Sequence, residues 1–126
     1  MSFSFHIKKE NNVLIIALNG SLNNKQQAEN LLEEIDFYFN EGVNAIILDL
    51  AEMEYMNSSG LGIFISILTQ TRNRNGEVVV INIPKKINQL LVITKLNNVF
   101  NIAHNIEEAK QLVVKDNNTV PTRDII

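Results

Sequence analysis

Three short aliphatic runs constrain the fold of this chain more than any other feature of its sequence. They are residues 13–18 (VLIIAL), residues 45–50 (AIILDL) and residues 78–81 (VVVI). Their apolar residues are nearly continuous, which is typical of strands that are covered on both faces or that lie in a parallel sheet. Parallel strands need crossover connections, so the sequence predicts a fold of the α/β class.

The segments between and after these runs have the spacing of helices. Residues 24–40 carry apolar side chains along one helical face, and Gly42 is a suitable C-terminal stop. A second helix, starting near Leu61, has two apolar faces and is expected to be largely buried. We expect a third helix after Pro84 and a final helix from Ile106.

Two further strands complete the predicted order. Residues 3–7 alternate between apolar and polar side chains, and with a turn at residues 11–12 they predict a hairpin with the first aliphatic run, whose strand ends at Gly20. Residues 99–103 form a short last strand. The predicted fold is therefore a mixed four- to five-stranded sheet with an N-terminal hairpin and four helices packed against it.

Length and composition suggest one domain and exclude several functions. Residues 1–114 are expected to form the domain, and residues 115–126, which are polar and contain a proline, a flexible C-terminal tail. The formal net charge is −3 without a basic block, so we expect neither nucleic-acid nor membrane binding. There is no cysteine, and His6 and His104 lack metal-ligand spacing, so neither a metal nor a cofactor is expected.

The amino terminus lacks the charged-then-apolar layout of a signal peptide. No apolar run approaches the roughly 20 residues that a membrane span requires. We therefore expect a cytoplasmic protein.

Residues 55–62 (YMNSSGLG) are predicted to lie where a parallel strand ends and a helix begins, the edge where ligands gather in open α/β sheets. Asn57 or Ser58 is suited to cap the helix, and capping explains much of the stretch. However, Gly60 and Gly62 leave the first turn uncovered, and each costs about 1 kcal/mol relative to alanine inside a helix. The residues alone leave two interpretations open: a structural cap, or a site that binds an anion or a partner.

Other residues are expected near this stretch. Asn82 follows the next strand and the loop after Leu22 follows the previous one, so the three loops are predicted to converge on one surface. Met53 and Met56 are either core residues or an adaptable apolar patch on that surface. Asp49 either caps the turn after its strand or takes part in the site.

The segment IILDLAEMEYMNSSGLGIFISI, residues 46–67, resembles the central motif of the STAS family, which comprises bacterial anti-sigma factor antagonists and their relatives. The similarity includes residues 20–23 (GSLN), 82–84 (NIP) and 96–102 (LNNVFNI), and it covers about residues 3–114. The SSGLG core is its most specific part. The resemblance implies a STAS fold and a regulatory protein rather than an enzyme.

The resemblance also implies a mechanism. The first serine of the pair, here Ser58, is the usual phosphate acceptor in the family. The implied partners are an anti-sigma factor with serine kinase activity, which binds the unmodified antagonist and releases its sigma factor, and a phosphatase that resets the switch. The implied partner-binding residues are Asn23, Met56, Asn57, Ser58, Ser59, Gly60, Leu61 and Asn82.

Two positions depart from the family pattern, which usually has aspartates where this chain has Asn57 and Asn23. If the kinase needs those carboxylates to orient the hydroxyl, Ser58 is a poor substrate; if they serve as caps, asparagine substitutes well. The departures favour an alternative function, a non-phosphorylated STAS scaffold subunit of a larger signalling or transport assembly. A small hydrolase ranks lowest, because neither histidine can be placed beside Ser58 as a base.

Overall fold

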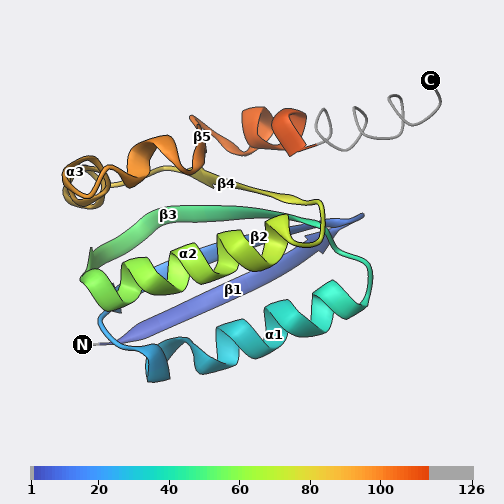
Figure 1. The fold of residues 1–126 in the computed structure, drawn as a ribbon, viewed down its shortest axis with the longest axis horizontal. Helices are drawn as coiled ribbons and strands as arrows, with labels where there is room; N and C mark the ends of the chain where they lie inside the picture. Colours follow the sequence, from blue (N-terminus) through green and yellow to red (C-terminus); the bar gives the residue numbers. More distant parts are fainter. Residues whose placement is uncertain (1, 114–126) are drawn as a thin grey trace.

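The structure is a computed structural model, and it describes residues 2–113. These residues form a five-stranded sheet in which each strand pairs with the next along the chain (Figure 1). The first two strands pair antiparallel and all later neighbours pair parallel, which confirms the predicted mixed sheet. The strands are β1 (Phe3–Glu10), β2 (Val13–Leu22), β3 (Ala45–Met56), β4 (Glu77–Ile81) and β5 (Asn101–Ala103).

Helices fill every connection between parallel strands, as predicted. They are the 3₁₀ helix η1 (Lys25–Ala28) with α1 (Glu29–Asn40), α2 (Ser58–Arg72), and α3 (Lys85–Ile93) with the 3₁₀ helix η2 (Leu96–Asn98). Residues 106–113 are also helical. The predicted domain end at residue 114 and the predicted tail lie outside the described residues.

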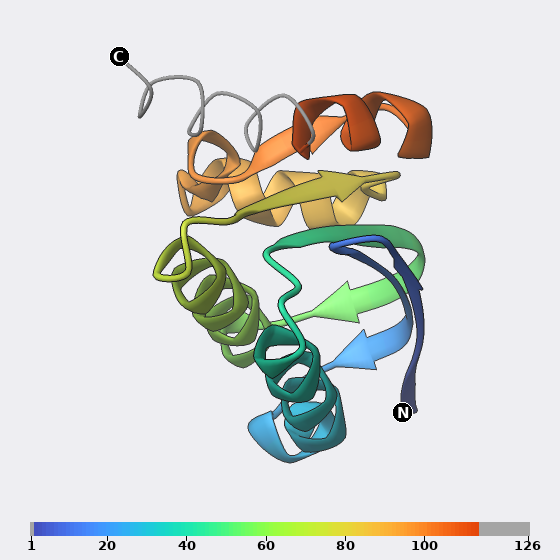
Figure 2. The same cartoon turned by 90° about the vertical axis from the view of Figure 1, so that its right-hand side faces the viewer.

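The helices divide into two layers, one on each face of the sheet. Figure 2 shows α1 and α2 on one side, and they share the larger core cluster with α3 through Leu31, Phe64 and Leu91. Right-handed crossovers that advance in one direction place their helices on the same face, which explains this arrangement. The helix at residues 106–113 covers the other face, where Ala109 and Ile47 belong to a second cluster.

Strand β3 is longer than predicted, and its length positions the candidate site. It has 12 residues, whereas β4 has five. Pairing with β4 ends at Asp49 and Ile81, but pairing with β2 continues to Leu22 and Met56. The sequence prediction ended this strand at Leu50. Register shifts in the pairing with β2 interrupt the two-residue alternation, so that the buried positions recur every third residue up to the end of the strand.

Strand β2 also continues past its predicted end at Gly20. This glycine lies inside the strand, paired with Phe3, and has a φ of 95°. A Cβ at this position would clash with the carbonyl oxygen of Ser2. Gly20 therefore allows β1 to approach β2 closely instead of ending the strand.

Candidate partner-binding site around Ser58

Asn57 caps helix α2 and thereby fixes the place of Ser58. Its backbone is extended (φ −109°, ψ −168°), and its Oδ1 accepts a hydrogen bond of 3.1 Å from the amide of Gly60. Its carbonyl accepts the first intrahelical bond, 3.0 Å from the amide of Leu61. Of the two residues proposed as caps from the sequence, the structure uses Asn57, so the Ser58 hydroxyl is not needed for capping.

The same side chain links α2 to the loop after β2. Nδ2 of Asn57 donates to the carbonyl oxygen of Asn23 at 2.9 Å, and the Asn57 amide donates to the carbonyl of Leu22 at 3.4 Å. Gln27 holds the loop from its other side, because its Oε1 accepts from the amides of Asn23 at 2.7 Å and Asn24 at 3.1 Å. Gln27 was not predicted from the sequence, although Asn24 and Gln27 have capping-box spacing.

Ser58 and Ser59 are the first two residues of α2, and both are exposed. Neither hydroxyl makes a hydrogen bond within residues 2–113. Their amides precede the first intrahelical bond, so the positive end of the helix dipole lies here, and the first turn has no acidic residue. A negative group attached to either hydroxyl would be favourably placed relative to this dipole.

Three other predicted partner-binding residues lie beneath this surface. Met56 is 2% exposed and Leu61 is 4% exposed, and Gly60 is buried as well. Both Met53 and Met56 belong to the main core cluster, so the core interpretation of the methionines is confirmed and the exposed-patch interpretation is wrong. These residues support the exposed serines from below.

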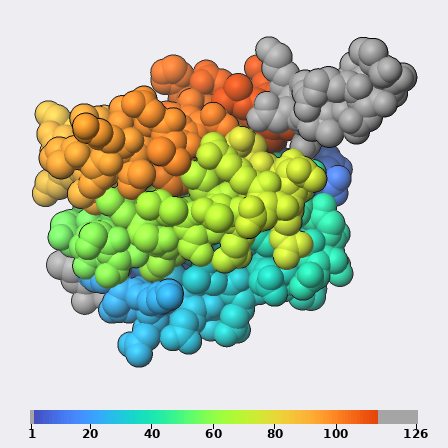
Figure 3. Space-filling model, in the orientation of Figure 1, coloured from blue at the N-terminus to red at the C-terminus, as the bar shows by residue number. Residues whose placement is uncertain are grey.

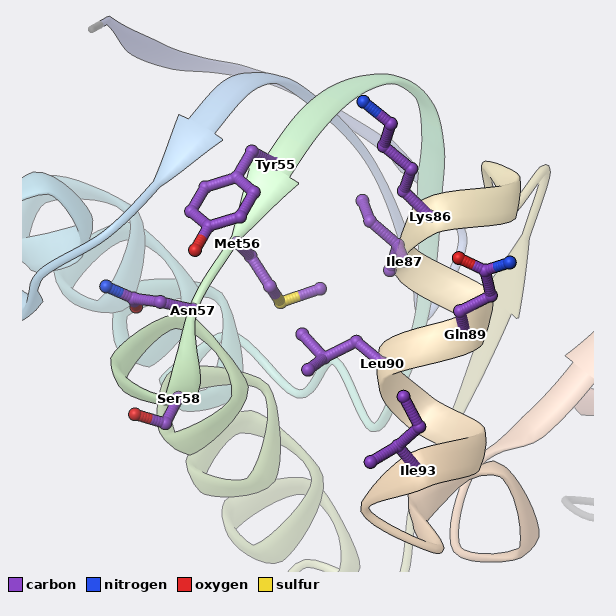
Figure 4. A pocket seen from close by; sticks show the side chains of 9 residues that line it. All are labelled: Tyr55, Met56, Asn57, Ser58, Lys86, Ile87, Gln89, Leu90 and Ile93. Atoms are coloured by element: carbon purple, nitrogen blue, oxygen red, sulfur yellow. The ribbon is translucent and has the colours of Figure 1, made fainter.

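A groove of about 390 Å³ separates the start of α2 from α3 (Figure 4). Met56 points from the end of β3 toward Leu90 of α3, which gives the groove an apolar floor. Tyr55 and Ile93 border it and are 49% and 78% exposed. The Ser58 hydroxyl points away from α3, and Ser58 is exposed (Figure 4).

The contribution of α3 to this groove was not found from the sequence. The sequence predicted a helix after Pro84 but did not connect Lys86, Leu90 or Ile93 with the site. One signal was present: residues 90–93 (LLVI) are four consecutive apolar residues, which cannot all face the core from one helix.

A second groove, of about 340 Å³, lies on the opposite side of α2. Ser59 and Gly62 border it from α2, and Lys25 and Leu32 border it from η1 and α1. The space-filling view shows α2 at the surface between α1 and the segment that contains α3 (Figure 3). The exposed start of α2 is therefore a ridge between two grooves; we call its exposed residues Ser58, Ser59 and Gly62 the Ser58 ridge.

Asn82 does not lie at this ridge. Its Nδ2 donates to Oδ1 of Asp49 at 3.0 Å, at the end of β4, and the same oxygen accepts from the amide of Ala51 at 3.0 Å. Strand β3 then continues for roughly 20 Å before α2 begins, at the usual rise per residue. The three predicted loops therefore do not form one surface, because the structure joins Asn23 to Asn57 and, separately, Asn82 to Asp49. A partner contact at Asn82 stays a prediction.

The histidines and the groups with shifted pKa values do not line the two grooves beside Ser58. His6 is paired with Ala17 in the sheet, and Nδ1 of His104 lies 3.3 Å from Oε2 of Glu108. Within residues 2–113, the groups whose pKa values are clearly shifted are Glu10 and Lys110, which form an ion pair at the hairpin end of the sheet. Across residues 2–113, no three His, Asp or Glu side chains are grouped so that they could hold a metal ion.

No helix in the described part of the chain has the length and apolar character needed to cross a membrane.

Comparison with known proteins supports the family that the motif suggests. The STAS domain family matches residues 4–109. BtrV of Bordetella bronchiseptica, named as a candidate anti-sigma factor antagonist, is 28% identical over 101 residues, which cover 80% of this chain and 86% of BtrV. The anti-sigma-B factor antagonist of Listeria monocytogenes is 32% identical over 76 residues, which cover 60% of this chain and 66% of that protein.

Solved structures share the fold. The crystal structure of TM1081 from Thermotoga maritima has a TM-score of 0.75 and 28% identity, covering 86% of this chain and 93% of that one. Unphosphorylated SpoIIAA has a TM-score of 0.69 and 18% identity, covering 89% of this chain and 98% of that one, and this likeness concerns the fold alone. The family match includes both β3 and the Ser58 ridge, and the chain therefore belongs to the STAS domain family, whose members include anti-sigma factor antagonists.

Proposed function

We propose that this chain is an anti-sigma factor antagonist, a cytoplasmic and non-catalytic regulator of transcription. Its Ser58 ridge binds an anti-sigma factor that has serine kinase activity. Phosphorylation of Ser58 by that partner ends the binding, and a phosphatase restores it. The observation that carries this proposal is the exposed Ser58 hydroxyl, which makes no hydrogen bond within the described chain and lies on a ridge between two grooves.

The hydroxyl of Ser58 is available for modification at little structural cost. Asn57 provides the cap, so a phosphate on Ser58 would leave the hydrogen bond to Gly60 in place. The phosphate would add about −1.5 to −2 charges at the positive end of the dipole, where the free chain tolerates them. The neutral amide of Asn57 would not repel it, whereas a carboxylate at this position would.

The same charge is unfavourable in a docked complex. A ridge that is buried against a partner loses its contact with water, and an unpaired charge there is strongly destabilising. Phosphorylation would thus leave the fold intact and weaken the complex. This asymmetry is what a reversible switch requires.

The surroundings of the ridge suit a protein partner. Tyr55 and Ile93 are large and exposed, and both line the first groove together with Ser58. Exposed aromatic and aliphatic side chains beside a polar ridge are typical of protein–protein interfaces. The relatives named as antagonists of anti-sigma factors support the class of partner. SpoIIAA, which shares the fold, has been solved in unphosphorylated and phosphorylated forms, so this fold accommodates the modification.

Phosphopeptide mass spectrometry after incubation with the cognate anti-sigma factor and ATP tests the modification. We expect one phosphate, on Ser58, which is lost in Ser58→Ala and retained in the matched control Ser59→Ala. Phosphate on Ser59 with Ser58 unmodified would contradict the assignment.

Binding of the Ser58→Asp variant separates the proposal from a second candidate function. Asn57 and Asn23 stand where the family usually has aspartates, and this favours a STAS scaffold subunit that is never phosphorylated. For an antagonist, the new charge should weaken binding to the anti-sigma factor at least about 30-fold, since an unpaired interfacial charge is strongly unfavourable. Unchanged binding would favour the scaffold.

A further inference from the structure

We propose that Asn57 is a positioning residue whose side-chain amide latches the loop after β2 to the start of α2. The latch consists of two hydrogen bonds of the Asn57 side chain, which accepts one and donates the other. Oδ1 accepts from the amide of Gly60 at 3.1 Å, and Nδ2 donates to the carbonyl of Asn23 at 2.9 Å. The latch holds Asn23 and Ser58 together in one surface. The identity of what that surface binds rests on the proposed function, but the latch itself does not depend on it.

The chemistry of the two bonds requires an amide at position 57. The group must accept from an N–H and donate to a carbonyl at the same time, and at this side-chain length only asparagine does both. An ionised aspartate keeps the bond to Gly60 but places a second oxygen against the carbonyl of Asn23. A serine also keeps the cap, but its side chain is one bond shorter and does not span to Asn23.

Loss of the latch should loosen the loop without unfolding the domain. The carbonyl of Leu22 would still accept from the Asn57 amide, at 3.4 Å. The capping box of Asn24 and Gln27 would still hold the first turn of η1, where the Gln27 amide donates to Oδ1 of Asn24 at 3.0 Å. Among the described residues, the backbone at Asn23 is held to the start of α2 by the latch alone.

Asn23 takes part in the latch through its backbone only. Its amide donates to Oε1 of Gln27 at 2.7 Å, and its carbonyl accepts from Asn57. Its side chain makes no hydrogen bond within the described chain, and the residue is half-buried. The fold therefore needs the amide at position 57 but leaves the side chain at position 23 available to a partner. This difference supplies a matched control.

Residue-resolved hydrogen exchange by NMR on the full chain tests the latch with three variants. Asn57→Asp and Asn57→Ser both keep the cap and remove the Nδ2 donor, and only Asn57→Asp adds a charge. Asn23→Asp adds the same charge but keeps the Nδ2 donor of Asn57. We expect the Asn23 amide to exchange about fivefold faster in both Asn57 variants, the effect of losing one net hydrogen bond, and at the wild-type rate in Asn23→Asp. Exchange in the core of β3 should be unchanged in all three. In the wild type, the Nδ2 protons of Asn57 should include one protected resonance, which Asn23→Asp retains.

Exchange at Asn23 that is unchanged in both Asn57 variants would overturn the latch. Faster exchange in Asn57→Asp and Asn23→Asp but not in Asn57→Ser would also overturn it, since charge would then be the cause. The positioning role has its own measurement: Asn57→Ser should weaken binding to the cognate anti-sigma factor several-fold, and unchanged affinity would overturn that role. If the wild type binds no anti-sigma factor, the proposed function fails while the exchange data still decide the latch.

Discussion

At Gly60, the first turn of α2 passes directly over the end of β2. A Cβ at this position would lie 2.6 Å from the carbonyl oxygen of Leu22 and 3.0 Å from Cβ of Met56. That carbonyl also accepts from the amide of Asn57, so it cannot move away without loss of a bond. At Gly62, a Cβ would meet nothing within 4 Å. Packing within the described chain therefore requires the first glycine and not the second.

The two glycines should respond oppositely to alanine. Gly60→Ala should lower the free energy of unfolding by about 1–3 kcal/mol, because the added methyl group overpacks a backbone contact. Gly62→Ala should raise it by about 0.5–1 kcal/mol, because alanine is the better helix former and the space is open. Urea denaturation measures both. Equal stability of Gly60→Ala and the wild type would mean that α2 does not need to approach β2 so closely.

At the scale of elements, the limits of sequence-based prediction follow from where each signal arises. The aliphatic runs of β2, β3 and β4 and the cap of α2 were predictable, because local periodicity and capping chemistry determine them. The last half of β3 was not, because its burial at Met53 and Met56 depends on the register with β2. The Asn57–Asn23 bond joins residues 34 positions apart, and no local pattern reveals it.

The groove beside α3 could not be predicted from local sequence either, because it exists only where α2 and α3 lie next to each other. The exposed Ile93 tests whether a partner uses this groove. Ile93→Ser should weaken binding to the anti-sigma factor at least about fivefold, as for a contact residue of an interface. Since Ile93 is 78% exposed, its replacement should change stability by less than about 0.5 kcal/mol.

Val92→Ser is the matched control for this prediction. Val92 is 50% exposed on the same helix and does not line the groove. Isothermal titration calorimetry should show wild-type affinity for Val92→Ser. If both variants lost affinity equally, the cause would be a general effect on α3. If both kept wild-type affinity, the partner would bind elsewhere.

At the scale of the whole molecule, the two faces of the sheet differ in how they are closed. Three helices seal the face that presents the Ser58 ridge, while the helix at residues 106–113 covers part of the other. An ion pair joins that helix to the N-terminal hairpin, with Oε2 of Glu10 lying 2.8 Å from Nζ of Lys110. The ion pair lies at the hairpin end of the sheet, where it connects the sheet to this helix at a distance from the Ser58 ridge.

This ion pair predicts how stability depends on pH. The hydrogen bond from Lys110 lowers the pKa of Glu10 below the ordinary value of 4.5, and the charges of Lys110 and Lys8 act in the same direction. The bond to Glu10 raises the pKa of Lys110 above 10.5, and Glu107 adds to this effect. Stability from the depressed carboxyl pKa is therefore present above 4.5 and is lost as the pH falls through the lowered value. Stability from the raised amine pKa is present below 10.5 and is lost as the pH rises through the raised value.

Thermal melts of the Glu10→Gln variant test this window. The variant should melt below the wild type at about pH 7, and the difference should shrink as the pH falls below 4.5 through the lowered pKa of the Glu10 carboxyl. Glu52→Gln is the control, because Glu52 is exposed and forms no ion pair among residues 2–113. A difference for Glu10→Gln that stays constant from neutral to acidic pH would assign its effect to packing. In that case the hairpin and the final helix would be joined by shape rather than by charge.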